Sequence, residues 1–377
     1  MFLSLTLYNF RNLKSDTIDL LAKEVFFVGE NAQGKSNLLE ALYYASYASS
    51  FRTHNESEVI VNGEKEMSIS AMFKSKDSTD IVNIKLQNGK KRIEKNSKRV
   101  TDRKDLINTI PCVLFSHGDI EFASGEPERR RFFIDQSLSM YDTVYLDTLR
   151  RYRRVLKSRN AVLKEQKFEL LASYDSLLSQ YGLEIQRKRR DAIFRFNQIF
   201  TRLFEEISGI ADLVISYEPV WKKKTDTGYE FPTQSEVIAH LEARREVDIK
   251  MGTTMSGPHR DRIRFLRGGV AFIPQASTGQ RRLVSLVLRV AQGVFYTQVT
   301  GKKPVFLMDD VLLELDPLKR EKLQSLLPDY DQLFCTFLPG EPYEHYKRSS
   351  TKVYFISNGS WESQSLSLKE QQPQAVL

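Results

Sequence analysis

Residues 29–36 read Gly29-Glu30-Asn31-Ala32-Gln33-Gly34-Lys35-Ser36, and this octapeptide decides the fold class. Its two glycines, lysine and serine have the spacing of a phosphate-binding loop. Residues 25–28 before it form a short apolar run that is typical of a buried strand, and residues 37–44 after it have the composition of a helix. Because a strand, a glycine loop and a helix follow one another in the order that the motif requires, the sequence predicts an α/β nucleotide-binding domain.

The loop predicts a role for each of its residues. Backbone N–H groups and the positive end of the following helix converge on the phosphates, and glycine allows the close approach. We expect Lys35 to reach the β- and γ-phosphates of ATP and Ser36 to bind Mg²⁺. The ATP-binding residues predicted here are Gly29, Glu30, Asn31, Ala32, Gln33, Gly34, Lys35, Ser36 and Asn37.

A second motif near the other end of the chain is an apolar run, residues 305–308, followed by Asp309 and Asp310. A strand without charge belongs in the centre of a parallel sheet, and ligands bind at the carboxyl ends of such strands. We expect Asp309 to bind Mg²⁺ through water. Asp310 is the predicted general base that orients and deprotonates the attacking water, with Lys35 as the other catalytic residue. Since many ATPases of this architecture have glutamate at the second position, the shorter Asp310 predicts slow turnover.

A third element, Ser277-Thr278-Gly279-Gln280, precedes these carboxylates and opens a helix. Taken alone, it is a capped helix start. Its place between the other two motifs indicates the signature of an ABC-type ATPase, which caps the γ-phosphate held by a second subunit. The order of the three motifs therefore predicts an ATP-dependent homodimer.

Composition limits the possible partners. The 377-residue chain has 56 Lys and Arg against 48 Asp and Glu, a net charge of +8, which favours a polyanion such as nucleic acid as the partner.

The cysteines and the N-terminal residues bear on the cellular compartment. Cys112 and Cys335 lack metal-site spacing and fit a reducing cytoplasm. Residues 1–10 read as a first strand rather than a targeting signal, and no apolar run approaches the ~20 residues of a membrane span, so we expect a cytoplasmic protein with no membrane partner.

The sequence pattern changes from strand-like to helical after residue 127. Residues 145–163 and 178–203 carry heptad-type apolar stripes that predict two neighbouring helices. The predicted architecture is an ABC-type, SMC-like head ATPase domain at residues 1–127 and 246–362, which includes the signature helix at 277–297. A mainly helical inserted domain occupies 128–245, with a loop at 221–231, and a flexible tail occupies 363–377.

Basic residues gather in the predicted helical insertion. Any single run could be a solvated helix face, but several together favour a surface that follows a phosphate backbone without reading sequence. The residues predicted to bind DNA are Arg150, Arg151, Arg187, Lys188, Arg189 and Arg190. Trp221, beside three lysines, is expected to pack in the core rather than stack on a base.

With these motifs together, the chain resembles the RecF family of bacterial recombination mediators, whose ATPase head is related to SMC proteins. The likeness covers about residues 1–340. Besides the ATPase motifs it rests on residues 8–12, 50–53, 127–135 (PERRRFFID), 155–160 (VLKSRN), 256–261 (SGPHRD) and 307–316 (LMDDVLLELD).

The resemblance implies roles for further residues. Arg11 and Asn31 would approach the nucleotide phosphates, Ser277 and Gly279 would act across the dimer, and Asp316 would be the D-loop aspartate at the subunit interface. The chain departs from the family at residues 117–118, where Pro-Glu is usual; Asp119 is the expected substitute. Thr336 stands where related ATPases have a switch histidine.

The resemblance also implies a function in DNA replication, DNA-damage repair and the SOS response. The ATP- and Mg²⁺-bound homodimer would clamp duplex DNA beside single-stranded gaps, and slow hydrolysis would release it. The implied partners are the RecO and RecR mediators and the RecA recombinase. Two alternatives remain: an ATP-gated scaffold with negligible hydrolysis, and an ABC transporter ATPase subunit, which the basic helical insertion argues against.

Overall fold

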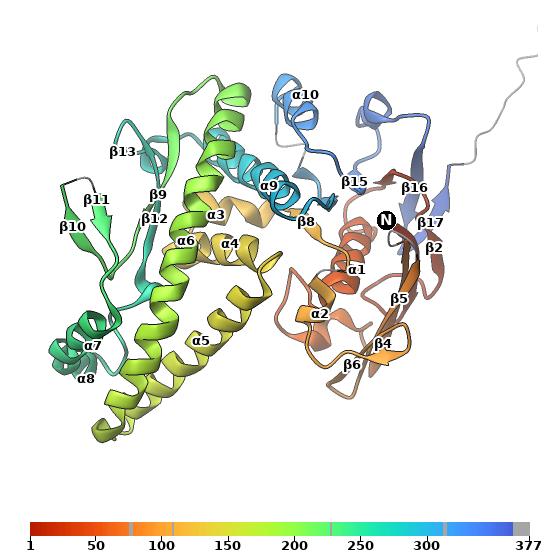
Figure 1. Cartoon of the computed structure of the whole chain (residues 1–377). Coiled ribbons are helices and arrows are strands. Elements are labelled where there is room, and N and C mark those ends of the chain that lie inside the picture. Colours follow the sequence, from red (N-terminus) through yellow and green to blue (C-terminus); the bar gives the residue numbers. More distant parts are fainter. Residues whose placement is uncertain (75–77, 108, 227, 312–314, 365–377) are drawn as a thin grey trace, which may run out of the picture. The chain divides into compact units, whose positions relative to one another are not determined.

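The computed structural model describes residues 1–74, 78–107, 109–226, 228–311 and 315–364. The chain divides into two compact units (Figure 1). The first comprises Met1–Leu114, Val305–Asp310 and Tyr330–Leu377, and the second comprises Phe115–Pro304 and Val311–Asp329. The tail predicted at 363–377 lies outside the described residues from residue 365 onward.

The first unit contains a mainly parallel sheet in the order β17-β16-β3-β15-β14-β8. Strand β3 pairs in parallel with both β15 and β16, so it is central, and all five of its residues are buried. This explains its uninterrupted apolar sequence after Glu24. The strands are β3 (Glu24–Val28), β8 (Cys112–Phe115), β14 (Val305–Met308), β15 (Gln332–Phe337), β16 (Thr351–Ser357) and β17 (Ser360–Ser363).

The second sheet of this unit is antiparallel, in the order β2-β1-β4-β5-β6-β7. Asn88 and Gly89 join β5 to β6 with φ of 49° and 70°, the left-handed pair that a tight hairpin needs. The strands are β1 (Phe2–Tyr8), β2 (Thr17–Asp19), β4 (Glu66–Lys74), β5 (Thr79–Gln87), β6 (Lys90–Lys95) and β7 (Lys98–Arg99).

Helix α1 (Lys35–Tyr47) contacts strands of both sheets, namely β4 and β5 of one and β14 and β15 of the other. Apolar side chains of the helix and the two sheets form one buried cluster. This core fixes the start of α1, where the phosphate loop ends. A short helix, α2 (Lys104–Ile107), completes the helices described in this unit.

The second unit is mainly helical. Helices α5 (Thr143–Lys164) and α6 (Leu171–Ser208) pack along each other, as their apolar stripes predict (Figure 1). The other helices are α3 (Ile120–Ser124), α4 (Pro127–Ser139), α7 (Gln234–Ala243), α8 (Arg245–Met251), α9 (Thr278–Thr300) and α10 (Pro317–Ser325).

Short strands flank these helices. Strands β9 (Leu213–Glu218), β12 (Arg262–Arg267) and β13 (Val270–Ala271) form an antiparallel sheet, and β10 (Lys223–Thr225) pairs with β11 (Gly228–Glu230). The loop predicted at 221–231 is therefore wrong in part, because backbone pairing makes a hairpin of it. Trp221 is buried, and its Nε1 donates to Ser256 Oγ at 2.9 Å, which confirms the expected core position.

Helix α9, which the signature opens, packs against α6 and α3. Residues 246–304 thus belong to the second unit, whereas the sequence prediction assigned them to the ATPase domain. The helix is long and apolar enough to cross a membrane by composition, but 72% of its most apolar window is buried inside the protein. Its apolar surface is accounted for by packing within the protein.

Candidate nucleotide site

The phosphate loop connects β3 to α1, and its two glycines are sterically required. Gly34 has φ of 117°, and a Cβ there would lie 2.9 Å from Leu13 Cδ2. A Cβ on Gly29 would lie 2.5 Å from the carbonyl oxygen of Ile356 on β16. The motif therefore folds as a close backbone turn against the sheet.

Lys35 is buried within this turn. Its Nζ donates to the carbonyl oxygens of Gly29 at 2.7 Å and Glu30 at 3.1 Å. These contacts hold the ammonium group inside the loop, where phosphate oxygens could replace the carbonyls as acceptors.

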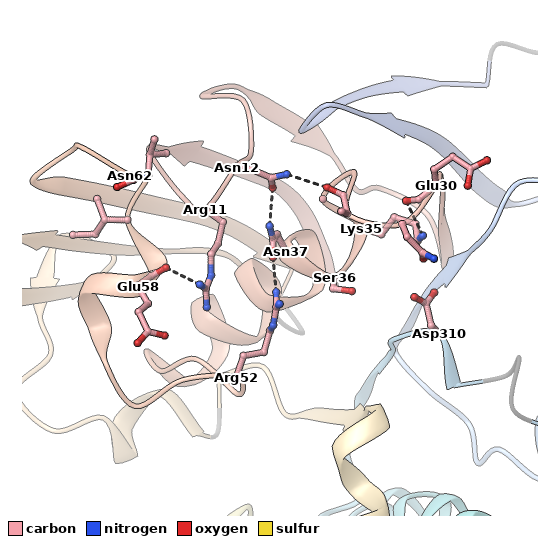
Figure 2. Close-up of a pocket in the computed structure, with 15 residues that line it drawn as sticks. Arg11, Asn12, Glu30, Lys35, Ser36, Asn37, Arg52, Glu58, Asn62 and Asp310 are labelled. Carbon is pink, nitrogen blue, oxygen red and sulfur yellow. Dashed lines mark hydrogen bonds between the residues drawn. The ribbon is translucent and has the colours of Figure 1, made fainter.

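A pocket of ≈ 660 Å³ opens beside the loop (Figure 2). Predicted residues that line it are Arg11, Glu30, Asn31, Ala32, Gly34, Lys35, Ser36, Asn37 and Asp310. The other lining residues are Asn12, Arg52, Glu58, Ile60, Val61 and Asn62. Asn12 and Arg52 lie in segments 8–12 and 50–53, which the sequence singled out, whereas it did not point to the other four. Gly29 and Gln33 are not among the lining residues, and Gln33 Oε1 instead accepts from the N–H of Asn358 at 2.6 Å.

Ser36 and Asp309 meet at the edge of the parallel sheet, 273 positions apart in the chain. Ser36 Oγ donates to Asp309 Oδ1 at 2.6 Å. Burial raises the pKa of Asp309, while the hydrogen bond from Ser36 opposes that rise. A hydroxyl and a carboxylate at this spacing fit the protein side of a Mg²⁺ site. The described residues contain no cluster of three or more His, Cys, Asp or Glu that could hold a metal.

Asp310 follows Asp309 with φ of 52°, a left-handed conformation that is uncommon outside glycine. Its N–H donates to Thr336 Oγ1 at 2.7 Å, and the Thr336 hydroxyl lies 2.7 Å from Asp310 Oδ1. Thr336 lies on β15, which pairs in parallel with β14. In the sequence, Thr336 stood out only because related ATPases have a histidine there. Its contact with Asp310 was not predicted.

Glu40 on α1 is fully buried and organises two cationic residues of the pocket. Its carboxylate accepts from Arg11 Nε at 2.9 Å and Arg11 Nη2 at 2.8 Å, and lies 3.5 Å from Arg52 Nη1. Arg52 also donates to Asn37 Oδ1 at 2.6 Å (Figure 2). One buried carboxylate thus positions two guanidinium groups at the pocket. The signal in the sequence was an acidic residue within the apolar stretch of a predicted helix.

The signature residues lie at the start of α9 in the second unit. Ser277 Oγ accepts from the N–H of Gln280 at 3.2 Å, and Gln280 Oε1 accepts from the N–H of Ser277 at 2.8 Å. Ser277, Thr278 and Gly279 are exposed. A Cβ added to Gly279 would approach nothing closer than Ser277 Oγ at 4.0 Å, so packing within the described chain does not require glycine there.

The predicted D-loop residue Asp316 caps α10. It accepts from the N–H of Lys319 at 2.9 Å and pairs with Lys319 Nζ at 2.6 Å, and these contacts lower its pKa. Residues 312–314 of the same motif lie outside the described residues. The roles of Asp316 and the signature across a dimer stay predictions.

Two expectations about charged residues need correction. Arg189 is buried, with Nε 2.9 Å from Asp135 Oδ1 and Nη1 3.1 Å from Asp261 Oδ2, so it is not a surface DNA-binding residue. Asp119 is also buried and pairs with Arg289 at 2.8 Å, so it does not replace the missing acidic residue at Mg²⁺ or water.

The remaining predicted DNA-binding residues keep their side chains at or near the surface. Arg151 and Arg187 are exposed. The other three have acidic neighbours: Arg150 lies 3.6 Å from Asp147, Lys188 lies 2.8 Å from Asp142, and Arg190 lies 3.2 Å from Asp191. In each pair the basic side chain is more than a third exposed, so solvent weakens these ion pairs enough for them to exchange for phosphate.

Comparisons with known proteins concern the family and the fold of the chain. The family model for the RecF/RecN/SMC N-terminal domain matches residues 1–361. The chain is 51% identical over 358 residues to the DNA replication and repair protein RecF of Treponema pallidum, covering 94% of this chain and 99% of the relative. RecF of Clostridium perfringens is 34% identical over 362 residues, with 94% and 98% covered.

Solved structures show the same fold. A structure of the recombination mediator protein RecF with ATP superposes with a TM-score of 0.84 at 27% identity, covering 96% of this chain and 97% of that one. The Smc head domain of Pyrococcus furiosus superposes with a TM-score of 0.54 at 15% identity, covering 96% and 95%. The fold class predicted from the sequence, an ABC-type ATPase head, is confirmed.

Proposed function

Since the chain belongs to the RecF family, within the wider RecF/RecN/SMC family, we propose that it is an ATP-hydrolysing protein of DNA replication and repair. The observation that carries this proposal is the hydrogen bond from Ser36 on the phosphate loop to Asp309 after β14. It joins the two halves of the nucleotide site within the first unit. A phosphate loop without a carboxylate partner would support binding alone.

The proposed chemistry follows from the residues at this edge of the sheet. Lys35 neutralises the β- and γ-phosphates, and the backbone N–H groups of the loop bind their oxygens. Asp310 orients the attacking water and accepts its proton, and Thr336 fixes the direction of the Asp310 carboxylate. When bound by Ser36 and Asp309, Mg²⁺ would supply charge neutralisation at the phosphates.

We propose that the site is completed by a second copy of the chain. The helix that starts after Ser277 begins with exposed residues, and such a helix end favours an anion. In the proposed dimer, Ser277 and Gly279 of one copy cap the γ-phosphate held by the other, and Asp316 lies at the subunit interface. The open space around Gly279 supports this role, since an approaching phosphate needs it.

The proposed cycle couples this dimer to DNA. The ATP-bound homodimer clamps duplex DNA beside single-stranded gaps, with Arg150, Arg151, Arg187, Lys188 and Arg190 contacting phosphates. It assists the loading of RecA, with RecO and RecR as partners, in the cytoplasm. Slow hydrolysis separates the subunits and releases the DNA.

Retention of DNA across salt concentrations tests this function. Immobilised gapped duplex should retain the protein with Mg²⁺ and ATP but release it with ADP, and retention should fall steeply as salt rises. Lys35→Ala should remove the ATP dependence. Equal retention with ATP, with ADP and without nucleotide would contradict the proposed clamp.

Asp310→Asn separates an ATPase from an ATP-gated scaffold. We expect it to bind ATP, abolish turnover and prolong DNA retention, because hydrolysis no longer ends the clamped state. If turnover in the parental protein is already undetectable and the substitution leaves retention unchanged, the scaffold is the correct function. Retention on DNA without any membrane component would exclude the transporter subunit.

A further inference from the structure

A second pocket lies within the second unit and plays no part in the chemistry above. It has a volume of ≈ 330 Å³ and is formed by α4, α5, α6 and the turn at Pro258–Arg260. Three sequence segments that the ATPase motifs leave unexplained meet there, namely residues 127–135, 155–160 and 256–261. The pocket therefore gives these segments a common location.

Its floor is a buried ionic cluster. Arg189 lies between Asp135 and Asp261, which bind its guanidinium at 2.9 and 3.1 Å. The Tyr145 hydroxyl donates to Asp135 and the Tyr217 hydroxyl to Asp261. Because these side chains are buried and already paired, the cluster fixes the shape of the pocket without offering Arg189 to a ligand.

One wall is a neutral histidine. The Thr254 carbonyl can only accept, so His259 Nε2 donates to it at 2.9 Å and Nδ1 accepts from the Tyr152 hydroxyl at 2.7 Å. Burial lowers the pKa of His259 to about 4. Both ring nitrogens are occupied, so His259 shapes the wall and is not an acid–base group.

Three further arginines, Arg131, Arg153 and Arg260, supply positive charge to the pocket. Arg131 donates to the Asp261 carbonyl at 3.0 Å, and Arg260 contacts Met255 Sδ at 3.6 Å. Within the described part of the chain, neither has a carboxylate within 4.0 Å, and Arg153, whose side chain is 61% exposed, lies 3.9 Å from Asp135. Burial, and then the charge of Arg189, lower the pKa of Arg131.

The acidic residues of the pocket do not cancel this charge. Asp135 is engaged by Arg189 and Tyr145, and Glu128 is exposed on the first turn of α4. The cluster has four arginines against three carboxylates, so its formal charge is +1. The arginines are Arg131, Arg153, Arg189 and Arg260, and the carboxylates are Glu128, Asp135 and the adjoining Asp261. Arg131 and Arg260 have no carboxylate within 4.0 Å in the described part of the chain, and the ion pair of Arg153 with Asp135 is long, at 3.9 Å. These three arginines are therefore the groups left to meet a ligand.

We propose that this pocket binds a phosphate group carried by a nucleotide, with Arg131, Arg153 and Arg260 as its donors. A terminal phosphate offers three oxygens in different directions, which three guanidinium groups can share, whereas a carboxylate offers two oxygens in one plane. A concave site suits a group that protrudes, such as a strand end or a free nucleotide, more than a continuous backbone. Phe132, 44% exposed at the pocket, supplies an apolar surface for the sugar or base.

The test uses 3′-labelled single-stranded oligonucleotides with either a 5′-phosphate or a 5′-hydroxyl, without ATP. Fluorescence anisotropy should show that the full-length protein binds the phosphorylated probe about tenfold more tightly. The double variant Arg153→Gln/Arg260→Gln should lose this preference. A matched double variant, Arg154→Gln/Arg195→Gln, removes the same charge from exposed helix positions outside the pocket and should keep it.

AMP as a competitor identifies the source of the phosphate. If AMP displaces the phosphorylated probe from the parental protein but not from the pocket variant, the ligand is a free nucleotide; displacement by neither AMP nor the hydroxyl probe indicates a strand end. No phosphate preference in the parental protein, or the same preference in the pocket variant, would overturn the proposal.

Two measurements keep this result separate from the proposed function. ATP binding by the pocket variant should be unchanged, and an unchanged far-UV circular dichroism spectrum shows that the helical second unit is folded. ATP-dependent retention on gapped duplex is measured independently, so a clamp that fails in the parental protein leaves the pocket result standing, and the reverse also holds.

Discussion

At the residue scale, the positioning of Asp310 depends on Thr336. Asp310 has a left-handed backbone, and two 2.7 Å hydrogen bonds to the same hydroxyl hold its N–H and its carboxylate. A carboxylate that must align a water molecule works only in a narrow range of orientations. Thr336 therefore acts through Asp310 and does not itself need to touch the nucleotide.

We predict that Thr336→Val lowers the kcat of ATP hydrolysis by about tenfold or more while leaving ATP affinity unchanged, because it removes the hydroxyl but keeps the shape. Thr336→Ser should restore most of the rate. Steady-state ATPase assays and nucleotide titrations measure the two quantities. Normal kcat in the valine variant, or equal loss in the serine variant, would show that this hydroxyl does not position Asp310.

The buried, neutral His259 should make the free energy of unfolding depend on pH. Its pKa is about 4 in the fold, below the ordinary 6.5, because burial and the nearby Arg260, Arg131 and Arg189 disfavour the cation. Between these two values the unfolded chain binds the extra proton, so the free energy of unfolding falls as pH is lowered from about 6.5 towards 4, by up to about 3 kcal/mol.

The variant His259→Gln isolates this effect, since glutamine does not titrate and can donate to Thr254 and accept from Tyr152. Urea unfolding at several pH values should show a shallower loss of stability in the variant across this window. Parallel pH profiles for the two proteins would mean that His259 is not held neutral.

At the scale of elements, one buried ionic cluster joins three helices. Arg159 of α5 lies 2.7 Å from Asp175 of α6 and 2.7 Å from Asp248 of α8, and all three side chains are fully buried. Thr254 also accepts from Arg159 at 2.8 Å. Removing the guanidinium would leave two carboxylates buried with too few donors.

We predict that Arg159→Ala destabilises the protein by about 3–5 kcal/mol. Arg154→Ala, an exposed site on the same helix, should change stability by less than about 0.5 kcal/mol. Chemical denaturation monitored by far-UV circular dichroism compares them. Near-equal midpoints for the two variants would refute a structural role for the cluster.

Local patterns predicted much of the fold. The phosphate loop and the apolar strand before Asp309 each depend on neighbouring residues, so their structure is readable from short segments. Glu40 was not identified, and Thr336 was noted only for the missing histidine, because the contacts of both side chains form only when separate elements come together in the fold. The contact between Thr336 and Asp310 arises only when β14 and β15 align in the sheet.

Arg189 was misread although the sequence held the signal. It lies four residues after Ile185 and three before Ala192, so it falls on the buried stripe of α6. Arg159 has the same relation to the stripe of α5, three residues after Leu156 and four before Leu163. A charged residue at a stripe position predicts a buried ion pair. At Arg189 the neighbouring basic residues obscure this signal, because the whole run resembles an exposed basic surface.

At the scale of the whole molecule, the proposed nucleotide site is complete only when two copies of the chain meet. The first unit contains the phosphate loop and the paired carboxylates, and the second contains the signature helix. The signature residues are exposed, and the cap that Ser277 and Gln280 form already orders the end of α9. A preformed helix end lowers the entropy lost when a second copy closes over the nucleotide.

Light scattering coupled to size-exclusion chromatography tests this central claim most directly. With Mg²⁺ and ATP, the mass should rise from that of the 43.7 kDa chain to about twice that value, and with ADP it should not. Ser277→Arg should bind ATP normally yet stay monomeric. A parental protein that binds ATP but remains monomeric, or a Ser277→Arg variant that dimerises as the parental protein does, would contradict a nucleotide site completed by two copies.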